Sequence, residues 1–374
     1  MLQNKIYQNF FIEIIKTFLI ILFGLTLIAL TVRAVSFLDL IVDNGYPISS
    51  YFEYSFLNLF GIAPKFIPLS FLLSLIIFIL KHLRDSEFVI LWTSGVKKIY
   101  IVNLFFLISL SVLIFYLILS TILTPIALNK SRQILSEDQL NSFLPTIRSQ
   151  QFSDSFKGFT FIVEKKINNE LKNIFLFDEG NNLKNLSSNE AKTNNTTIVS
   201  KSGIVEKNKM ILFNGQIITA KKSGDDNEII KFEQLNIDLS DLSNTTIKEP
   251  KLQETSTIKL INCFINNSYN NKICKEDYKK EILATLSRRF VIPFYIPIVS
   301  LLCSMLLIKT DRAYLNKVSI FFYCFSLLLF TELAVRYTGI SQIMRLSFII
   351  LPISLIFFMY SFLIYKFSRE SKST

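Results

Sequence analysis

The chain has 374 residues, of which 51% are hydrophobic and 36 are Phe, and its mean hydropathy is +0.42. A soluble domain of this size rarely carries so much apolar surface, so the composition favours an integral membrane protein. The formal net charge is +11, but Lys and Arg are scattered and many of them flank apolar runs. This distribution argues against a nucleic-acid partner and for anchoring at a membrane surface.

Six apolar runs are long enough to cross a bilayer as helices, because about 20 residues span its hydrocarbon core. They lie near 14–36, 59–80, 99–123, 290–308, 318–337 and 344–365. No small-residue cleavage site follows the first run, so we expect it to remain as a helix. The predicted domains are three spans in 1–125, a polar domain in 126–285, and three spans with a short tail in 286–374.

The charges of the connecting loops predict the orientation of the spans. The loop 37–58 has no Lys or Arg and carries Asp39, Asp43 and Glu53. The ends and loops on the opposite side are rich in cations: Lys5, Lys81, Arg84, Lys97, Lys98, Lys309, Arg312, Lys317, Lys366, Arg369 and Lys372. Both termini are therefore predicted to be cytoplasmic, and the polar domain is predicted to lie outside.

Residues 156–240 alternate between apolar and polar side chains in short runs such as GFTFIVEKK and NIFLFDEG. This pattern predicts an antiparallel all-β domain, either a small sandwich or a curled sheet. Asn214-Gly215 between two β-type runs predicts a hairpin turn, and Ser223–Asp226 predicts a second turn. The Asn-rich stretch 250–280 is predicted to be a loop, with a short helix beginning near Asp277.

The sequence contains no metal-ligand cluster, Gly-rich phosphate loop or catalytic triad. We therefore predict a non-enzymatic chain with no cofactor of its own. The single His, His82, is interpreted as an interfacial residue beside Lys81. Cys303 and Cys324 lie in apolar runs and are expected to be inert. Cys263 and Cys274 could form a disulfide if their polar stretch faces an oxidising compartment.

Several cations stand at the outer ends of the predicted spans, where the orientation rule does not require them. Ionisable side chains at membrane depth are costly and tend to face a cavity or a partner. Snorkelling to lipid head groups is an alternative explanation, and Arg336 could instead pair with Glu332 one helical turn earlier. The outer cations together predict a basic ring suited to a phosphorylated amphiphile, since Arg binds phosphate in a bidentate manner. The ring consists of Arg33, Lys65, Arg288, Arg289 and Arg345.

The segment 84–98, RDSEFVILWTSGVKK, lies between the second and third spans. Asp85 or Ser86 can cap a short helix, Glu87 suits its positive N-terminal end, and Gly95 suits its C-terminal end. Lys97 and Lys98 would anchor the segment to anionic head groups. One interpretation is a helix lying on the membrane surface, with an apolar face that is buried: Phe88, Val89, Leu91 and Trp92.

This layout resembles the LptF/LptG permeases of the lipopolysaccharide exporter, over nearly the whole chain. The resemblance rests on VRAVSFLDLIVDNG at the end of the first span, on SEFVILWTSGVKK, and on ILATLSRRFVIPFYIP entering the fourth span. The manner in which the first span ends is more similar to LptF than to LptG. The Asn-rich loop with its two Cys departs from the family.

The resemblance implies a multi-pass permease of the bacterial inner membrane with a jellyroll-like periplasmic domain. It would lie among the inner membrane lipids and form a heterodimer with an LptG-type permease. This pair would assemble with an LptB ATPase dimer and LptC, and it would export lipopolysaccharide from the outer leaflet of the inner membrane. ATP and Mg²⁺ would be bound by the partner ATPase. Arg33 matches the family's substrate-contacting Arg, whereas the other cations of the ring are inferred from position.

In this family the segment between the second and third spans couples the permease to the ATPase. The resemblance implies such a coupling helix over residues 84–96, with a polar contact and apolar knobs that enter a groove of the ATPase. The matching residues are Glu87, Phe88, Ile90, Trp92 and Gly95. Two other classes of protein remain possible from the residues alone: a membrane-anchored sensor with an outside β domain, and an ion-coupled transporter, which should carry ionisable groups near the midplane.

Overall fold

The structure is a computed structural model, and it describes residues 2–42, 47–141, 149–156, 159–167, 169–179, 193–206, 209–221, 228–238, 251–266, 279–308, 313–338 and 342–373. The chain divides into two compact units. One unit comprises residues 1–31, 57–129 and 251–374, and the other comprises residues 32–56 and 130–250. The described residues 251–266 and 279–285, which the sequence assigned to the polar domain, belong to the helical unit.

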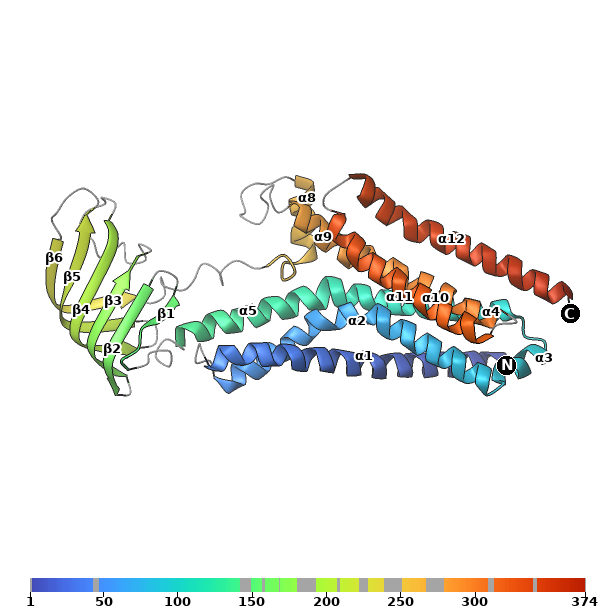
Figure 1. Cartoon of the computed structure of the whole chain (residues 1–374), viewed down its shortest axis with the longest axis horizontal. Helices are drawn as coiled ribbons and strands as arrows, with labels where there is room; N and C mark the ends of the chain where they lie inside the picture. Colours follow the sequence, from blue (N-terminus) through green and yellow to red (C-terminus); the bar gives the residue numbers. More distant parts are fainter. Residues whose placement is uncertain are drawn as a thin grey trace. The chain divides into compact units, whose positions relative to one another are not determined.

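Among the described residues, six helical segments are long and apolar enough to cross a membrane, which confirms the predicted spans. The first two are α1 (Leu2–Val42) and α2 (Ile48–Arg84). The third consists of α4 (Lys98–Ile118), η1 (Leu119–Leu123) and α5 (Thr124–Asn141). The fourth consists of α9 (Lys279–Phe290), η5 (Ile292–Phe294), α10 (Tyr295–Ser304) and η6 (Met305–Leu307). The last two are α11 (Ala313–Tyr337) and α12 (Gln342–Ser373) (Figure 1).

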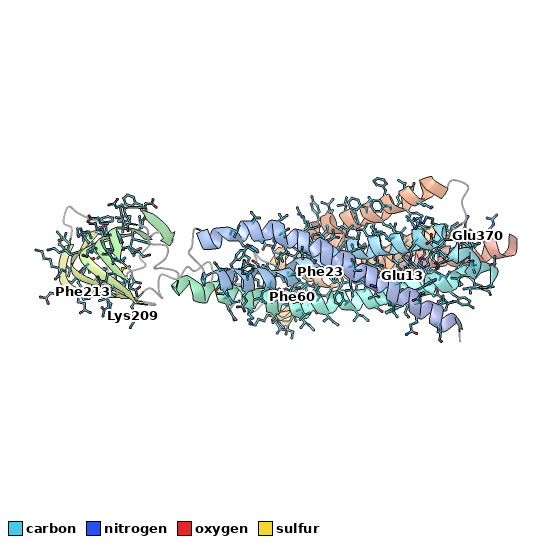
Figure 2. All side chains as sticks on the ribbon, turned by 90° about the horizontal axis from the view of Figure 1, so that it is seen from below. Glu13, Phe23, Phe60, Lys209, Phe213 and Glu370 are labelled. Atoms are coloured by element: carbon cyan, nitrogen blue, oxygen red, sulfur yellow. The ribbon has the colours of Figure 1, made fainter. Side chains whose placement is uncertain are left out.

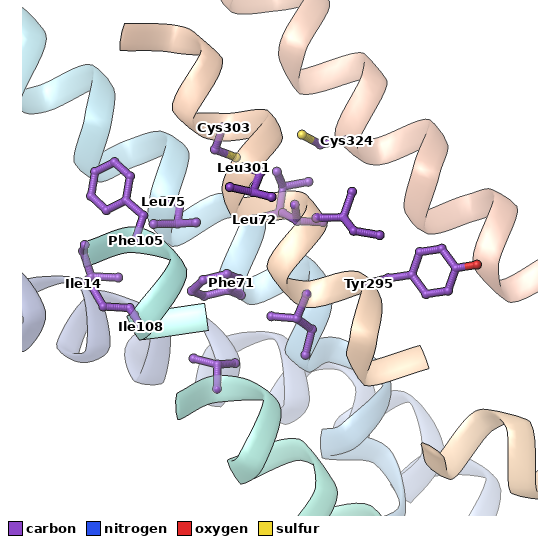
Figure 3. Close-up of a cluster of buried hydrophobic side chains, with 14 of the residues drawn as sticks. Ile14, Phe71, Leu72, Leu75, Phe105, Ile108, Tyr295, Leu301, Cys303 and Cys324 are labelled. Atoms are coloured by element: carbon purple, nitrogen blue, oxygen red, sulfur yellow. The ribbon is translucent and has the colours of Figure 1, made fainter. Parts of the chain in front are cut away.

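The core of the helical unit is built from side chains of several spans. Phe71 of α2, Phe105 of α4 and Leu301 of α10 are fully buried and lie close together (Figure 3). Cys303 and Cys324 are buried and free, in line with their apolar surroundings. The fourth span is the most enclosed, with 72% of its apolar stretch buried, against 17% for the first and sixth spans. The exposed faces of these two spans can therefore contact lipid or another protein. One of the exposed side chains is Phe23 of the first span, which Figure 2 labels.

The third span contains a π-helical turn, η1, between two α-helical stretches. The hydroxyl of Thr124 lies 2.9 Å from the Leu119 carbonyl, five residues earlier, and 2.8 Å from the Phe60 carbonyl of α2. A π turn contains one residue more than an α turn, and such turns occur often at functional sites. The wide turn therefore coincides with a close contact between the second and third spans.

The all-β prediction is confirmed by six antiparallel strands that form a single sheet in sequence order. They are β1 (Ser153–Phe156), β2 (Phe159–Ile167), β3 (Glu170–Asp178), β4 (Thr193–Glu206), β5 (Lys209–Lys221) and β6 (Glu228–Asp238). Apolar residues on one face form a second core, which includes Phe161, Leu176 and Ile198. Of the two predicted forms, the described strands adopt the curled sheet (Figure 1).

The predicted hairpin at Asn214-Gly215 is wrong, because both residues lie inside β5. Asn214 has a positive φ of 51°, and Asn173 in β3 has one of 50°. The strand register places both in one polar row across the sheet, with Glu164, Lys201 and Glu233. Buried side chains on either side of this row are an odd number of residues apart, as in Leu171 and Ile174, whereas a regular strand requires an even spacing. The left-handed Asn residues thus mark a bend of the sheet.

Gly215 is required for a different reason. A Cβ atom there would collide with the Phe232 ring and lie 2.5 Å from the Val199 carbonyl oxygen. The Phe232 ring therefore packs directly against the backbone of β5, which only a residue without a side chain permits. The other predicted turn, Ser223–Asp226, lies outside the described residues.

The loop prediction for 250–280 is wrong for residues Thr257–Asn266, which form the helix α8. Residues 267–278 lie outside the described residues, and α9 begins at Lys279, close to the predicted start at Asp277. Cys263 on α8 is disulfide-bonded, whereas its expected partner, Cys274, lies outside the described residues.

Candidate functional site

A pocket in the helical unit gathers three of the five predicted phosphate-binding cations, Lys65, Arg288 and Arg289. Its walls come from α2, the π turn region of the third span, the turn before α8, α9, and α11. The complete lining is Gly61, Pro64, Lys65, Pro68, Tyr116, Ser120, Thr124, Gln253, Thr285, Arg288, Arg289, Ile292 and Glu332. We call this the basic pocket. Three cations face one carboxylate, so its charge favours an anionic ligand.

Arg288 is the cation with a donor left for a ligand. Its Nη2 lies 3.2 Å from the Glu332 carboxylate, and its side chain is 35% exposed. Its Nε is buried and makes no hydrogen bond to the described residues. The Tyr116 hydroxyl donates to the Arg288 carbonyl oxygen at 3.1 Å and so holds the backbone of α9 against α4. A shift of the Arg288 side chain toward an acceptor in the pocket would bring the buried Nε, alone or together with an Nη in place of Glu332, into hydrogen-bond reach.

Arg289 has a different role, because its guanidinium is already occupied. The side chain is only 4% exposed. Its Nη1 donates to the Thr257 hydroxyl at 2.7 Å, and its Nη2 donates to the carbonyls of Gln253 and Thr255 at 3.0 Å each, with the Leu252 carbonyl at 3.5 Å. Arg289 therefore holds the turn before α8 against α9, and its positive charge, neutralised by none of these acceptors, adds to the potential of the pocket.

The remaining cations differ in their positions. Lys65 is exposed on α2 between Pro64 and Pro68 and lines the pocket. Arg33 is exposed on α1 and belongs to the unit that contains the sheet. Arg345 is half-buried on α12 and is not part of the pocket lining among the described residues. Arg336 is exposed, and Glu332, its possible partner, forms an ion pair with Arg288.

Sequence reasoning missed the polar side chains that the third and fifth spans contribute. Tyr116, Ser120 and Thr124 recur every four residues on one face of the third span, and this spacing within an apolar run could have indicated them. Glu332 was identified from the sequence only as a possible partner of Arg336, although an acidic residue inside the fifth span also indicates a cavity. None of the groups of His, Cys, Asp and Glu among the described residues is suited to a metal ion.

The segment between the second and third spans forms the predicted short helix, α3 (Glu87–Thr93). Gly95 has a φ of 90°, its N–H donates to the Trp92 carbonyl, and the Val96 N–H donates to the Leu91 carbonyl, each at 3.1 Å. These two bonds are the Schellman motif, so the predicted stop at Gly95 is confirmed. The predicted cap is not observed, because Ser86 is in the left-handed region and its side chain makes no capping hydrogen bond.

The two faces of α3 differ from the prediction. Phe88 is fully buried in the helical core, so it cannot serve as a knob for another protein. Trp92 is half-buried and stacks on Phe88, with ring centroids 6.0 Å apart. Val89 is 47% exposed, which contradicts its predicted burial, and Ile90 is 64% exposed. The outer face thus consists of Glu87, Val89 and Ile90, together with Thr93 and Ser94 at the end of the helix.

His82 is buried, at 2% exposure, rather than interfacial. Its Nδ1 lies 2.9 Å from the Phe78 carbonyl oxygen. Its Nε2 lies 3.2 Å from the Glu87 carboxylate and 3.5 Å from that of Glu13, which also accepts a hydrogen bond from Lys81 at 2.6 Å. The ring therefore links the start of α3 to both α1 and α2.

Comparison with known proteins agrees with this architecture. Residues 10–366 match the family described as lipopolysaccharide export system permease LptF/LptG. No match was found among curated proteins. The family match covers all six spans and the inserted sheet. The chain therefore belongs to the LptF/LptG family of lipopolysaccharide export system permeases.

Proposed function

We propose that this chain is the transmembrane permease subunit of an ATP-driven exporter that extracts lipopolysaccharide from the outer leaflet of the inner membrane. The observation that carries the proposal is the basic pocket, in which Arg288 presents a buried, unpaired Nε beside Lys65 and the charge of Arg289. The phosphates of lipid A are anions that such an arrangement suits. The substrate would then pass to the β domain, on its way to the outer membrane.

We propose that both termini lie in the cytoplasm and the sheet in the periplasm, an orientation that the loop charges support. The weakly buried first and sixth spans leave apolar faces that suit a second permease subunit of the LptG type and the membrane helix of LptC. The end of the first span supports assignment of this chain as the LptF-like member of the pair.

Within the pocket, each residue has a separate part in binding. Arg288 donates to the phosphate through Nε and, once Glu332 is displaced, through Nη2. Lys65 adds an ammonium at the exposed rim. Arg289 fixes the rim through the carbonyls of the turn before α8 and contributes charge without contacting the ligand. Arg33 is proposed as an additional phosphate ligand at the end of the first span.

The ATPase contact is proposed to use the outer face of α3. Glu87 supplies the polar contact, and Val89 and Ile90 supply the apolar surface, because these side chains are exposed. Phe88 and Trp92 face the helical core and would support α3 from beneath. The two LptB subunits would bind ATP and Mg²⁺, and closure of the ATPase dimer would displace α3.

The phosphate-binding proposal is tested by crosslinking lipopolysaccharide to the assembled complex. The double variant Lys65→Met/Arg288→Met should reduce crosslinking about 100-fold or more, since each of the two lost hydrogen bonds from a charged donor weakens binding by about 1.5 kcal/mol or more. Arg336→Met is the matched control, because it removes an outer cation that does not line the pocket. Unchanged crosslinking in the double variant would show that the basic pocket is not the substrate site.

Arg33 requires its own variant, since it belongs to the other compact unit. Arg33→Glu should weaken lipopolysaccharide crosslinking while the permease, ATPase and LptC still co-purify. Crosslinking at the level of the unaltered complex would remove Arg33 from the proposed site and leave the role of the basic pocket intact.

A further inference from the structure

One ammonium group connects four elements of the helical unit. Lys98, the first residue of α4, donates to the Glu370 carboxylate of α12 at 2.7 Å and to the Leu307 carbonyl oxygen of η6 at 3.1 Å. Its Nζ also lies 4.6 Å from the centre of the Trp92 ring, which belongs to α3, and 5.6 Å from that of Phe367. The C-terminal part of α12, where Glu370 lies (Figure 2), is thus joined to α3 through a single side chain.

These contacts do not fit the expected role of Lys98 as a head-group anchor. Its side chain is 20% exposed and that of Glu370 is 25% exposed, so both charges are largely withdrawn from solvent. Lys97, the neighbouring residue, is exposed and remains suited to head-group contact. Withdrawing two charges from water is costly, so such a pair is better explained by the geometry that it imposes than by stability.

The short helix α3 is held at both ends. At its start, Glu87 lies 3.2 Å from His82 of α2. Near its end, the Trp92 ring stacks on the buried Phe88 ring and also lies 4.6 Å from the Lys98 ammonium. A force on the exposed face at Ile90 is therefore passed to both attachments, since the buried rings beneath α3 belong to a close-packed core.

We propose that Lys98 is a positioning residue that transmits displacement of α3 to the sixth span and to the end of the fourth. When α3 moves, the Trp92 ring moves with it, and Lys98 carries that movement to Glu370 and to the Leu307 carbonyl. The inference rests on the proposed function in one respect, namely that an ATPase displaces α3. The connection itself is a property of this chain and can be measured without the ATPase.

The connection is measured first in the full chain in lipid nanodiscs, through its single Trp. Lys98→Met should shift the emission of Trp92 and increase its quenching by acrylamide, because the ring loses its cationic cover. Lys97→Met is the matched control, and it should leave both quantities unchanged. An unchanged Trp92 signal in Lys98→Met would mean that the ammonium does not hold the ring, and it would overturn the inference.

The transmission is measured in the assembled complex, as lipopolysaccharide exported per ATP hydrolysed. Lys98→Met and Glu370→Gln should each lower this ratio about fivefold or more, the lower range of coupling between distant sites. The double variant should be no worse than either single variant, because the two groups act through one another. Lys98→Arg keeps the charge and the stacking and should retain most of the ratio, which a nonspecific folding defect in Lys98→Met would not explain.

Glu87→Ala in the same assay separates the two proposals. If Glu87→Ala lowers the ratio and Lys98→Met does not, the inference about Lys98 is overturned and the proposed ATPase contact stands. If neither variant lowers the ratio, α3 does not couple hydrolysis to export, and both proposals are wrong. A loss in both variants, with Lys97→Met unaffected, supports both.

Discussion

Replacing Arg289 with Met should loosen the turn before α8 without removing a ligand from the basic pocket. The guanidinium holds the carbonyls of Gln253 and Thr255 and the hydroxyl of Thr257, which itself donates to the Thr121 carbonyl of the third span at 2.8 Å. Met has a similar length and no donor, so the substitution removes the hydrogen bonds with little change in volume. Arg288→Met, one residue earlier, is the matched control.

The magnitude follows from the contacts. The buried Arg289 guanidinium donates three hydrogen bonds of 3.0 Å or less. At about 1.5 kcal/mol for each bond from a charged donor, losing all three removes about 4–5 kcal/mol of stabilising free energy. The substitution also removes the cost of burying an ion, which is several kcal/mol in a protein interior. The carbonyls regain hydrogen bonds to water when the turn opens. We therefore expect the free energy of local opening to fall by about 2 kcal/mol, which corresponds to about a 30-fold increase in the opening equilibrium constant.

Hydrogen exchange of the full chain in nanodiscs measures this local opening. The informative amides are those of Glu254, Thr255 and Leu260, whose N–H groups bond to backbone carbonyls within the turn and the first turn of α8. Their exchange should accelerate about 30-fold in Arg289→Met and remain close to its original rate in Arg288→Met. Equal protection in the unaltered chain and in Arg289→Met would refute the structural role of Arg289.

Three further predictions concern the sheet, the outer face of α3 and the pocket. Gly215→Ala should destabilise β4 and β5 by about 1–3 kcal/mol, by hydrogen exchange, because the new methyl group meets backbone. Gly203→Ala, which meets only flexible side-chain ends within 3.0 Å, should cost less, and an equal cost would contradict this reasoning. Ile90→Asp should reduce co-purification of the ATPase without lowering the thermal stability of the chain, and a full yield of ATPase would exclude this face as the contact. Glu332→Gln releases Arg288 and should increase lipopolysaccharide crosslinking several-fold, whereas a decrease would show that the carboxylate assists binding.

Much of the helical architecture could be predicted from the sequence, because each span is a long apolar run with few alternatives in a bilayer. The helix α8 could not, since its ten residues, TIKLINCFIN, are too few to distinguish from the surrounding Asn-rich stretch. Its position depends on Arg289 and Thr121, which lie in other spans. The hairpin prediction at Asn214-Gly215 failed for a related reason, because β5 pairs on both sides and Gly215 lies opposite Ser200 of β4 and Phe232 of β6.

The cations of the pocket were found from their position at span ends, but their roles depended on tertiary contacts. Arg288 and Arg289 are adjacent in sequence and equally basic, yet one faces Glu332 and the other faces the carbonyls of the turn before α8. Phe88 is directed inward by Phe10 and Phe78, whose rings lie 6.0 and 6.3 Å from its own. Such neighbours are distant in sequence, so the local pattern of residues does not reveal them.

The π turn of the third span also bears on how this helix tolerates changes in length. Each residue of an α-helix advances the rotation by about 100°, so a deletion within a regular span turns everything beyond it onto a different face. Within η1, removal of one residue converts the wide turn to an ordinary α turn and keeps the helix on either side in phase. Ile122 and Leu123 are 52% and 41% exposed, so the core places little demand on either. The path from Lys98 to Asn141 thus contains one residue more than its two faces require, and η1 is where a residue can be lost without rotating the rest of the span.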